Sequence, residues 1–248
     1  MAASIDINDP AHPKRVLVVA ANPSTSTQTG WPIGFWWAEL SHPYWEFTEH
    51  GYEVTIVSPD GGALVADGFS DPEDASGYSA HDLISLGFKH SPTHAALLEN
   101  TARLGDTDLD SFDAVFLVGG QSPMYTFRDN PDVHAAVRHF FEAGKPTAIV
   151  CHATSVLLDA RTSDGELIVN DRTWTGFANS EEAFADEFVG QKIQPYWIEE
   201  EAGKLPGTNF IVSSMFKPFA VRDGNLITGQ QQYSGTAAAR LVIEALGV

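Results

Sequence analysis

The stretch Pro146-Thr-Ala-Ile-Val-Cys-His152 decides the fold that we expect for this chain. Its residues before the cysteine form a short, mostly apolar run, which is typical of a buried strand in a parallel sheet. Residues 153–160, directly after it, favour a helix. A strand that passes into a helix with almost no loop makes a sharp turn, and this turn presents one side chain at the top of the sheet. Cys151 is the residue at this strand-to-helix elbow.

Strand-like and helix-like stretches alternate on both sides of the elbow. Strands are expected at residues 15–21, 52–58 and 113–118, with a hairpin at 166–175 and a strand pair at 220–228. Helices are expected at 31–50, 93–104, 131–143 and 235–246. The alternation predicts one α/β domain over residues 1–248, with a mostly parallel sheet and helices on both faces. The polar residues 1–13 are expected to be flexible.

The composition narrows the classes of partner. Hydrophobic residues make up 43% of the 248 residues, which fits a folded globular protein. Acidic residues outnumber Lys and Arg by 33 to 14, so the formal charge of −19 repels phosphate-rich partners. Neither an apolar run of about 18 residues nor the apolar core of a signal peptide is found. We therefore expect no nucleic-acid or membrane partner and a cytoplasmic location.

The cysteine at the elbow is the only one in the chain, which excludes an internal disulfide and a multi-cysteine zinc site. A helix N-terminus beside Cys151 favours its thiolate. In a parallel sheet the carboxyl ends of the strands lie at one edge, so the strand ends at 21–22, 119–120 and 151–152 are expected to meet there. There the backbone amides of Gly120 and His152 are suited to form an oxyanion hole. On these features alone, two interpretations of Cys151 stay open. It is either a catalytic nucleophile or a buried core cysteine beside a tight glycine turn.

Several motifs resemble a known family. Asp113-Ala-Val-Phe-Leu-Val-Gly-Gly120, Ala143-Gly-Lys-Pro146 and Ala148-Ile-Val-Cys-His152 resemble the PfpI superfamily, relatives of the class I glutamine amidotransferases. Residues 34–43, 51–59, 60–62, 175–177 and 223–229 are similar to its chaperone and glyoxalase III branch. The resemblance spans nearly the whole chain in the right order. It implies a flavodoxin-like fold and a homodimer.

The resemblance also implies roles for single residues. Cys151 is the expected nucleophile, His152 its base, and Glu39 the carboxyl that shares a proton with the thiolate. A carboxyl group facing a thiolate should be protonated, because two anions in one dry pocket repel each other. Glu39 can then pass its proton to a substrate oxygen or carbon.

The third member of the implied triad is an acid that orients His152. In the branch, this acid follows Thr-Gly-Phe at short spacing, where the present chain has Glu181 and Glu182. Position favours Glu182, and spacing alone leaves Glu181 open as the alternative. The glutamate that is not used is expected in the first turn of a helix, with Ser180 near its cap.

The expected activity is a cysteine-dependent, glutathione-independent glyoxalase that converts methylglyoxal-type 2-oxoaldehydes to 2-hydroxy acids, without a cofactor. Two departures from the branch keep alternatives open: Ala153-Thr154 replaces Gly-Pro, and Gln230-Gln-Gln-Tyr-Ser234 replaces Asn-Pro-Ala-Ser. Both segments are expected to line the pocket. The alternatives are a cysteine-dependent hydrolase, hydratase or biosynthetic enzyme on another small electrophile, and a stress holdase chaperone.

The remaining histidines and aromatic residues carry weaker signals. A metal site at His81, His90 and His94 with Asp82 is not expected, because Pro92 interrupts the helical spacing. His134 and His139 are expected on a helix surface. Core packing is favoured for most of an aromatic cluster, with pocket lining or a dimer contact as alternatives; its members are Trp31, Trp36, Trp37, Tyr44 and Trp45.

Overall fold

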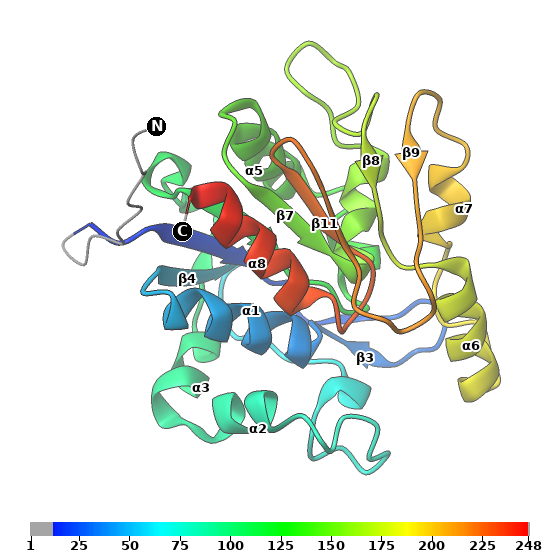
Figure 1. Cartoon of the computed structure of the whole chain (residues 1–248). Helices are drawn as coiled ribbons and strands as arrows, with labels where there is room; N and C mark the ends of the chain where they lie inside the picture. The colour runs from blue at the N-terminus through cyan, green and yellow to red at the C-terminus, as the bar shows by residue number, and fades with distance from the viewer. Residues whose placement is uncertain (1–11, 248) are drawn as a thin grey trace.

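The computed structural model describes residues 12–247 (Figure 1). A seven-stranded sheet has the order β10-β11-β7-β6-β1-β4-β5, and every neighbouring pair is parallel except the antiparallel pair β10 and β11. The strands are β1 (Arg15–Val19), β4 (Glu53–Ser58), β5 (Ala102–Arg103), β6 (Ala114–Leu117), β7 (Thr147–Val150), β10 (Ala220–Asp223) and β11 (Leu226–Gly229). The predicted mostly parallel sheet is confirmed. The segment 1–13 is expected to be flexible, and residues 1–11 of it lie outside the described residues.

Helices cover both faces of the sheet. Figure 1 shows α1 and α8 side by side in front of the sheet and α5 behind it. The α-helices are α1 (Trp37–Glu49), α2 (Leu83–His90), α3 (Pro92–Glu99), α4 (Pro123–Thr126), α5 (Pro131–Glu142), α6 (Asn179–Val189), α7 (Ile198–Ala202) and α8 (Gly235–Leu246). Short 3-10 helices are η1 (Gly68–Ser70), η2 (Leu104–Asp106), η3 (Leu109–Ser111) and η4 (Cys151–Leu158). Within residues 12–247, none of the helices is long and apolar enough to cross a membrane.

Three local predictions are corrected by the structure. The helix expected from residue 31 begins at Trp37, because Pro32–Ile33 forms β3 and pairs with β2 (Ser24–Thr25). The helix expected at 93–104 ends at Glu99, and α2 precedes it. The hairpin at 166–175 is wrong, because β8 (Thr173–Trp174) pairs in parallel with the distant β9 (Asn209–Phe210).

The central strands form the core that positions the site. All four residues of β6 and of β7 are buried, as are the last four of β1. Full burial of each large aliphatic side chain contributes about 1.5–3 kcal/mol. Because these strands are parallel, their carboxyl ends bring residues 20–22, 119–120 and 151–152 to one edge, as predicted.

Candidate active site

The strand-to-helix elbow is present at Cys151. This residue follows β7 directly and has a φ of 55°, in the left-handed region that a side chain rarely adopts. The whole of η4 is buried, and Thr154 Oγ1 donates a hydrogen bond to the Cys151 carbonyl oxygen at 2.6 Å. Such a backbone conformation persists only where its surroundings hold it. The elbow is therefore held by the packing of η4 and by this hydrogen bond.

Glu39 lies in the first turn of α1 and is fully buried. Its Oε2 accepts a hydrogen bond from the Gly119 backbone amide at 2.9 Å. Burial raises the pKa of Glu39 to about 7, although the Cys151 thiol, His152 and the Gly119 amide each lower it. A Cβ at Gly119 would lie 2.4 Å from Glu39 Oε2 and 2.8 Å from Cys151 Cβ, so only glycine leaves room between them.

Burial raises the pKa of the Cys151 thiol well above its ordinary value, and the Glu39 carboxylate raises it further. The backbone amides of His152 and Gly120 lower it by hydrogen bonding to the sulfur. These two hydrogen bonds favour the thiolate, but burial and Glu39 outweigh them, so the thiolate is not favoured as the sequence predicted. The two amides are those predicted for the oxyanion hole, and they lie beside the sulfur. Gly120 has a φ of 111°, and a Cβ there would lie 2.6 Å from backbone atoms of residues 34–36.

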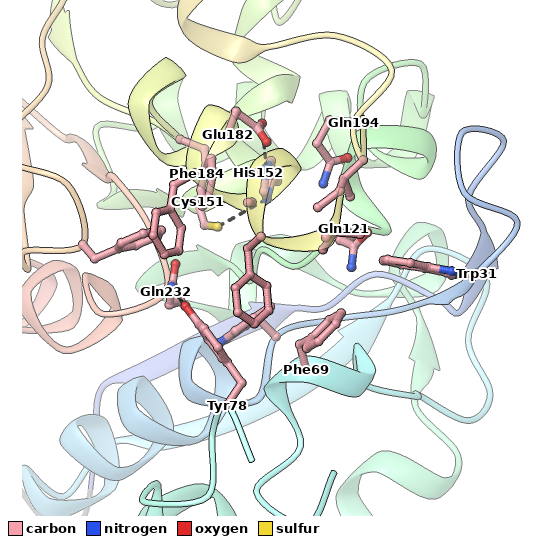
Figure 2. A pocket seen from close by; sticks show the side chains of 17 residues that line it. Trp31, Phe69, Tyr78, Gln121, Cys151, His152, Glu182, Phe184, Gln194 and Gln232 are labelled. Carbon is pink, nitrogen blue, oxygen red and sulfur yellow. Dashed lines mark hydrogen bonds and ion pairs between the residues drawn. The ribbon is translucent and has the colours of Figure 1, made fainter. Parts of the chain in front are cut away.

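His152 joins the cysteine to an acid. Its Nδ1 lies 3.5 Å from Cys151 Sγ, and its Nε2 lies 3.0 Å from Glu182 Oε1 (Figure 2). The ring stacks on Phe177 with centroids 4.1 Å apart. Burial opposes the charged imidazolium, but Glu182, with smaller contributions from Glu39 and Asp67, outweighs this effect, so the pKa of His152 is raised. The structure thus brings Cys151, His152 and Glu182 into one line of contacts.

Glu181 makes its hydrogen bonds to groups other than His152. Its Oε2 accepts from the Ala178 amide at 3.1 Å, and its Oε1 accepts from the Phe216 amide at 2.8 Å and from Gln230 Nε2 at 2.9 Å. The helix α6 begins at Asn179, so its N-cap is Ala178, and Ser180, expected as the cap, is the second residue of the helix. Glu181 connects the start of α6 to the segment before β10, while Glu182, one residue on, contacts His152.

Asp67 is a buried acid that sequence reasoning missed. Its Oδ1 accepts from the Gly34 amide at 2.9 Å and its Oδ2 from the Gln121 amide at 2.6 Å. Burial raises its pKa to about 7. Asp67 therefore connects the chain before α1 to the turn after Gly120. No local pattern distinguishes it from the exposed Glu73 or the half-buried Asp74 in the same irregular region.

The two departures from the branch take different positions. Ala153 and Thr154 are buried within the elbow and do not line the pocket. Gln230 binds Glu181 and the Ser213 amide, so it also serves the scaffold. Gln232 lines the pocket, and its Nε2 donates to Tyr78 Oη at 3.1 Å. The expectation that both segments line the pocket is therefore correct only for Gln232.

Nearly half of the residues that line the pocket at Cys151 are Phe, Trp or Tyr. Its lining includes Trp31, Trp36, Phe69, Tyr78, Phe177, Phe184, Phe188 and Phe216. Two of the five clustered aromatic residues, Trp31 and Trp36, thus line the pocket. Trp37 is buried in the core, Tyr44 packs against it, and Trp45 is exposed.

The other histidines are dispersed. His42 pairs with Asp82 at 2.8 Å, His90 with Glu73 at 3.0 Å, and His94 Nδ1 lies 2.7 Å from Ser91 Oγ. Both histidines of α5, at positions 134 and 139, are half-buried rather than fully on the surface. In the part of the chain that the structure describes, no three His, Cys, Asp or Glu residues are grouped as metal ligands.

Residues 34–245 match the DJ-1/PfpI family, and this chain belongs to it. The resemblance to the PfpI superfamily is therefore confirmed, and relatives named as glyoxalases or deglycases support an enzyme.

Individual relatives and solved structures are similar to this chain over nearly its whole length. The chain is 26% identical to the probable glutathione-independent glyoxalase hsp3103 of Schizosaccharomyces pombe, over 96% of this chain and 100% of the relative. Among solved structures, the Rapid Encystment Protein 24 kDa of Francisella tularensis has a TM-score of 0.84 at 23% identity, covering 95% of this chain and 100% of the other. Glyoxalase III of Candida albicans has a TM-score of 0.77 at 23% identity, covering 94% and 98%. These two structures show the same fold.

Proposed function

We propose that this protein is a glutathione-independent glyoxalase that converts methylglyoxal-type 2-oxoaldehydes to 2-hydroxy acids, with Cys151 as its nucleophile. The observation that carries the proposal is the position of Glu39, a buried carboxyl with a pKa raised to about 7, against the same glycine as Cys151. A hydrolase of the cysteine type needs a nucleophile and a base, but an isomerisation also needs a group that carries a proton between two carbons. The relatives named as glyoxalases support the same reaction.

The first step is addition of the Cys151 sulfur to the aldehyde carbon C1. A C–S bond forms, the C=O π bond breaks, and the thiol proton passes through His152 or Glu39 to the new oxygen, which gives a hemithioacetal. The backbone amides of Gly120 and His152 stabilise the negative charge that develops on this oxygen. Glu182 orients the His152 ring for this transfer.

The second step moves a proton from C1 to C2. Removal of the C1 proton gives an enediolate, and protonation at C2 leaves a thioester at C1 and a hydroxyl at C2. Glu39 and His152 are the groups that carry the proton, since a pKa near neutrality lets a carboxyl both accept and donate. Water then cleaves the C–S bond of the thioester, which releases the 2-hydroxy acid and the free thiol.

The test is conversion of methylglyoxal to lactate with no glutathione and no metal added, followed by NMR. In heavy water, part of the product should carry deuterium at C2, because the carried proton exchanges with solvent. Cys151→Ala should abolish turnover and Glu39→Gln should remove most of it, while the exposed Trp45→Ala serves as control. A wild-type protein with a reactive Cys151 that leaves methylglyoxal and glyoxal untouched would overturn the proposal.

A different small electrophile is the second candidate. The line of contacts from Cys151 through His152 to Glu182 is suited to covalent catalysis on other carbonyl compounds, in a hydrolase, hydratase or biosynthetic enzyme. A panel of small carbonyl compounds, tested on wild type and Cys151→Ala, separates this candidate from the first.

A holdase activity is the third candidate, because Leu83 and Phe188 are 72% and 62% exposed. Exposed apolar surface is what a holdase presents to an unfolding client. Suppression of aggregation that survives Cys151→Ala would favour it.

The single domain over residues 1–248, the homodimer and the cytoplasmic location are also proposals. Light scattering of the purified protein tests the dimer, and fractionation of cells tests the location.

A further inference from the structure

A continuous set of rings lines one side of the entrance to Cys151. Phe69 lies 6.5 Å from Tyr78 and 6.4 Å from Phe188, measured between ring centroids. Phe188 lies 6.4 Å from Phe184, whose ring in turn lies 5.3 Å from that of Phe216. All five residues line the pocket. The rings come from η1, from the loop before α2, from α6 and from the segment before β10, so distant parts of the chain together form this aromatic wall.

The aromatic wall lies at the mouth and the cysteine at the bottom. Cys151 is 2% exposed, whereas Phe184 and Phe188 are 42% and 62% exposed. Both phenylalanines lie on α6, the helix that carries Glu182. A substrate bonded through C1 to the sulfur would extend its substituent from the bottom toward these rings. A methyl group is short, while an aryl group provides a flat face that rings can contact by stacking or edge-to-face packing.

The charges of the pocket favour a neutral substrate. Among the residues described, no Lys or Arg lines it, and its lining acid, Glu182, is paired with His152. The buried carboxyl groups of Glu39 and Asp67 lie close enough to His152 to influence its pKa. A substrate that carries a phosphate or carboxylate would find no Lys or Arg side chain here, and burial of its charge without such a partner costs free energy.

Two glutamines offer unused hydrogen bonds to the polar end of a substrate. Gln121 and Gln194 both line the pocket, and the buried Oε1 of each has no hydrogen-bond partner within the described chain. Figure 2 shows both amides on the side of the pocket away from Phe184 and Gln232. A buried amide without a partner costs free energy that a bound polar group recovers. Hydroxyl groups of a hydrated or enzyme-bound dicarbonyl compound supply such a group.

We infer that the preferred substrate is a neutral 2-oxoaldehyde with an aromatic substituent, an arylglyoxal, whose ring lies against the aromatic wall while its two carbonyl carbons lie between Cys151 and the glutamine amides. This inference rests on the proposed function, since it assigns the substrate class of that same site. Phe184 and Phe188 are its specificity-determining residues.

The test compares phenylglyoxal with methylglyoxal in the full-length protein, with mandelate and lactate measured as products. Wild type should convert phenylglyoxal with about tenfold higher kcat/KM, because burial of a ring and its ring–ring contacts together provide a factor of this size. Phe188→Ala and Phe184→Ala should each lower the ratio of the two kcat/KM values by about three- to tenfold, chiefly through KM. Both side chains are exposed, so neither variant removes core packing. Trp45→Ala, an exposed ring on α1 outside the pocket, is the matched control and should leave the ratio unchanged.

The outcomes separate this inference from the proposed function. Turnover of methylglyoxal with no preference for phenylglyoxal, or a ratio that the phenylalanine variants do not change, overturns the aryl specificity and leaves the glyoxalase reaction in place. If neither aldehyde is converted, the proposed function fails. Binding of the unreactive probe acetophenone then shows whether the pocket still binds an aryl group. Saturation-transfer NMR should then show acetophenone bound to wild type and to Trp45→Ala but weakened in Phe188→Ala; equal signals in all three overturn the site as well.

Discussion

His152 Nε2 lies 3.0 Å from Glu182 Oε1, and both side chains are buried. A carboxylate at this distance holds the proton of a neutral imidazole on Nε2, which leaves Nδ1 free to accept the proton of the Cys151 thiol. The thiol sulfur lies 3.5 Å from that Nδ1. The acid thus acts on the cysteine through the ring that it orients.

Glu182→Gln should lower kcat by about 10- to 100-fold, because a partner that orients a reacting imidazole contributes this much. Loss of an ion pair should also lower the pKa of His152, since the carboxylate raises it. The kcat-against-pH profile should therefore shift to lower pH in the variant. Unchanged kcat and an unchanged profile would remove Glu182 from the mechanism.

Glu181→Gln is the matched control at the neighbouring position, with the opposite expected result. Its two carboxyl oxygens accept hydrogen bonds from two backbone amides and from Gln230, and Glu181→Gln replaces one oxygen by an NH2 group, so at least one of these donors loses its acceptor. A buried donor left unsatisfied costs about 1–3 kcal/mol. Thermal unfolding should show a lower Tm while kcat stays close to that of wild type. A large loss of kcat with an unchanged Tm would reverse the roles of the two glutamates.

The sequence predicted the central strands well because they are nearly continuous apolar runs that are buried on both faces. It left Glu181 and Glu182 undecided, since both lie in the first turn of one helix and only tertiary contacts separate them. Asp67 escaped detection for a similar reason. Its partners, the amides of Gly34 and Gln121, are more than 30 residues away, and backbone amides leave no trace in a sequence.

Stability should depend on pH through Glu39. Its pKa rises from the ordinary 4.5 to about 7 on folding, so the folded chain keeps a proton that the unfolded chain releases. The resulting contribution is fully present below about pH 4.5 and is lost as pH rises toward about 7. Glu39→Gln cannot ionise, so its Tm should rise relative to wild type as pH increases through this window. Trp45→Ala, which removes no titratable group, should show a constant difference; a constant difference for Glu39→Gln would contradict the raised pKa.

Alkylation and turnover should respond oppositely to the same substitution. Burial raises the pKa of the Cys151 thiol, and the Glu39 carboxylate adds to it. Removing this charge in Glu39→Gln should shift the pH midpoint of iodoacetamide alkylation to lower pH, so the thiol reacts faster near neutrality. Turnover should nevertheless fall, because the proton carrier between C1 and C2 is gone. A midpoint that stays in place or moves to higher pH would show that Glu39 does not act on the sulfur through its charge.

Gln230 and Gln232 should separate stability from substrate binding. Gln230 is fully buried and holds Glu181 and the Ser213 amide, so Gln230→Ala removes hydrogen bonds of the scaffold and should lower Tm by several degrees. Gln232 lines the pocket and donates to Tyr78 Oη, so Gln232→Ala frees this ring and should change KM while Tm stays nearly constant. Steady-state kinetics and thermal unfolding of both variants measure the separation. The opposite result, in which Gln230→Ala changes KM and Gln232→Ala changes only Tm, would contradict this assignment. Gln230, rather than Gln232, would then be the residue of the 230–232 segment that acts on the substrate.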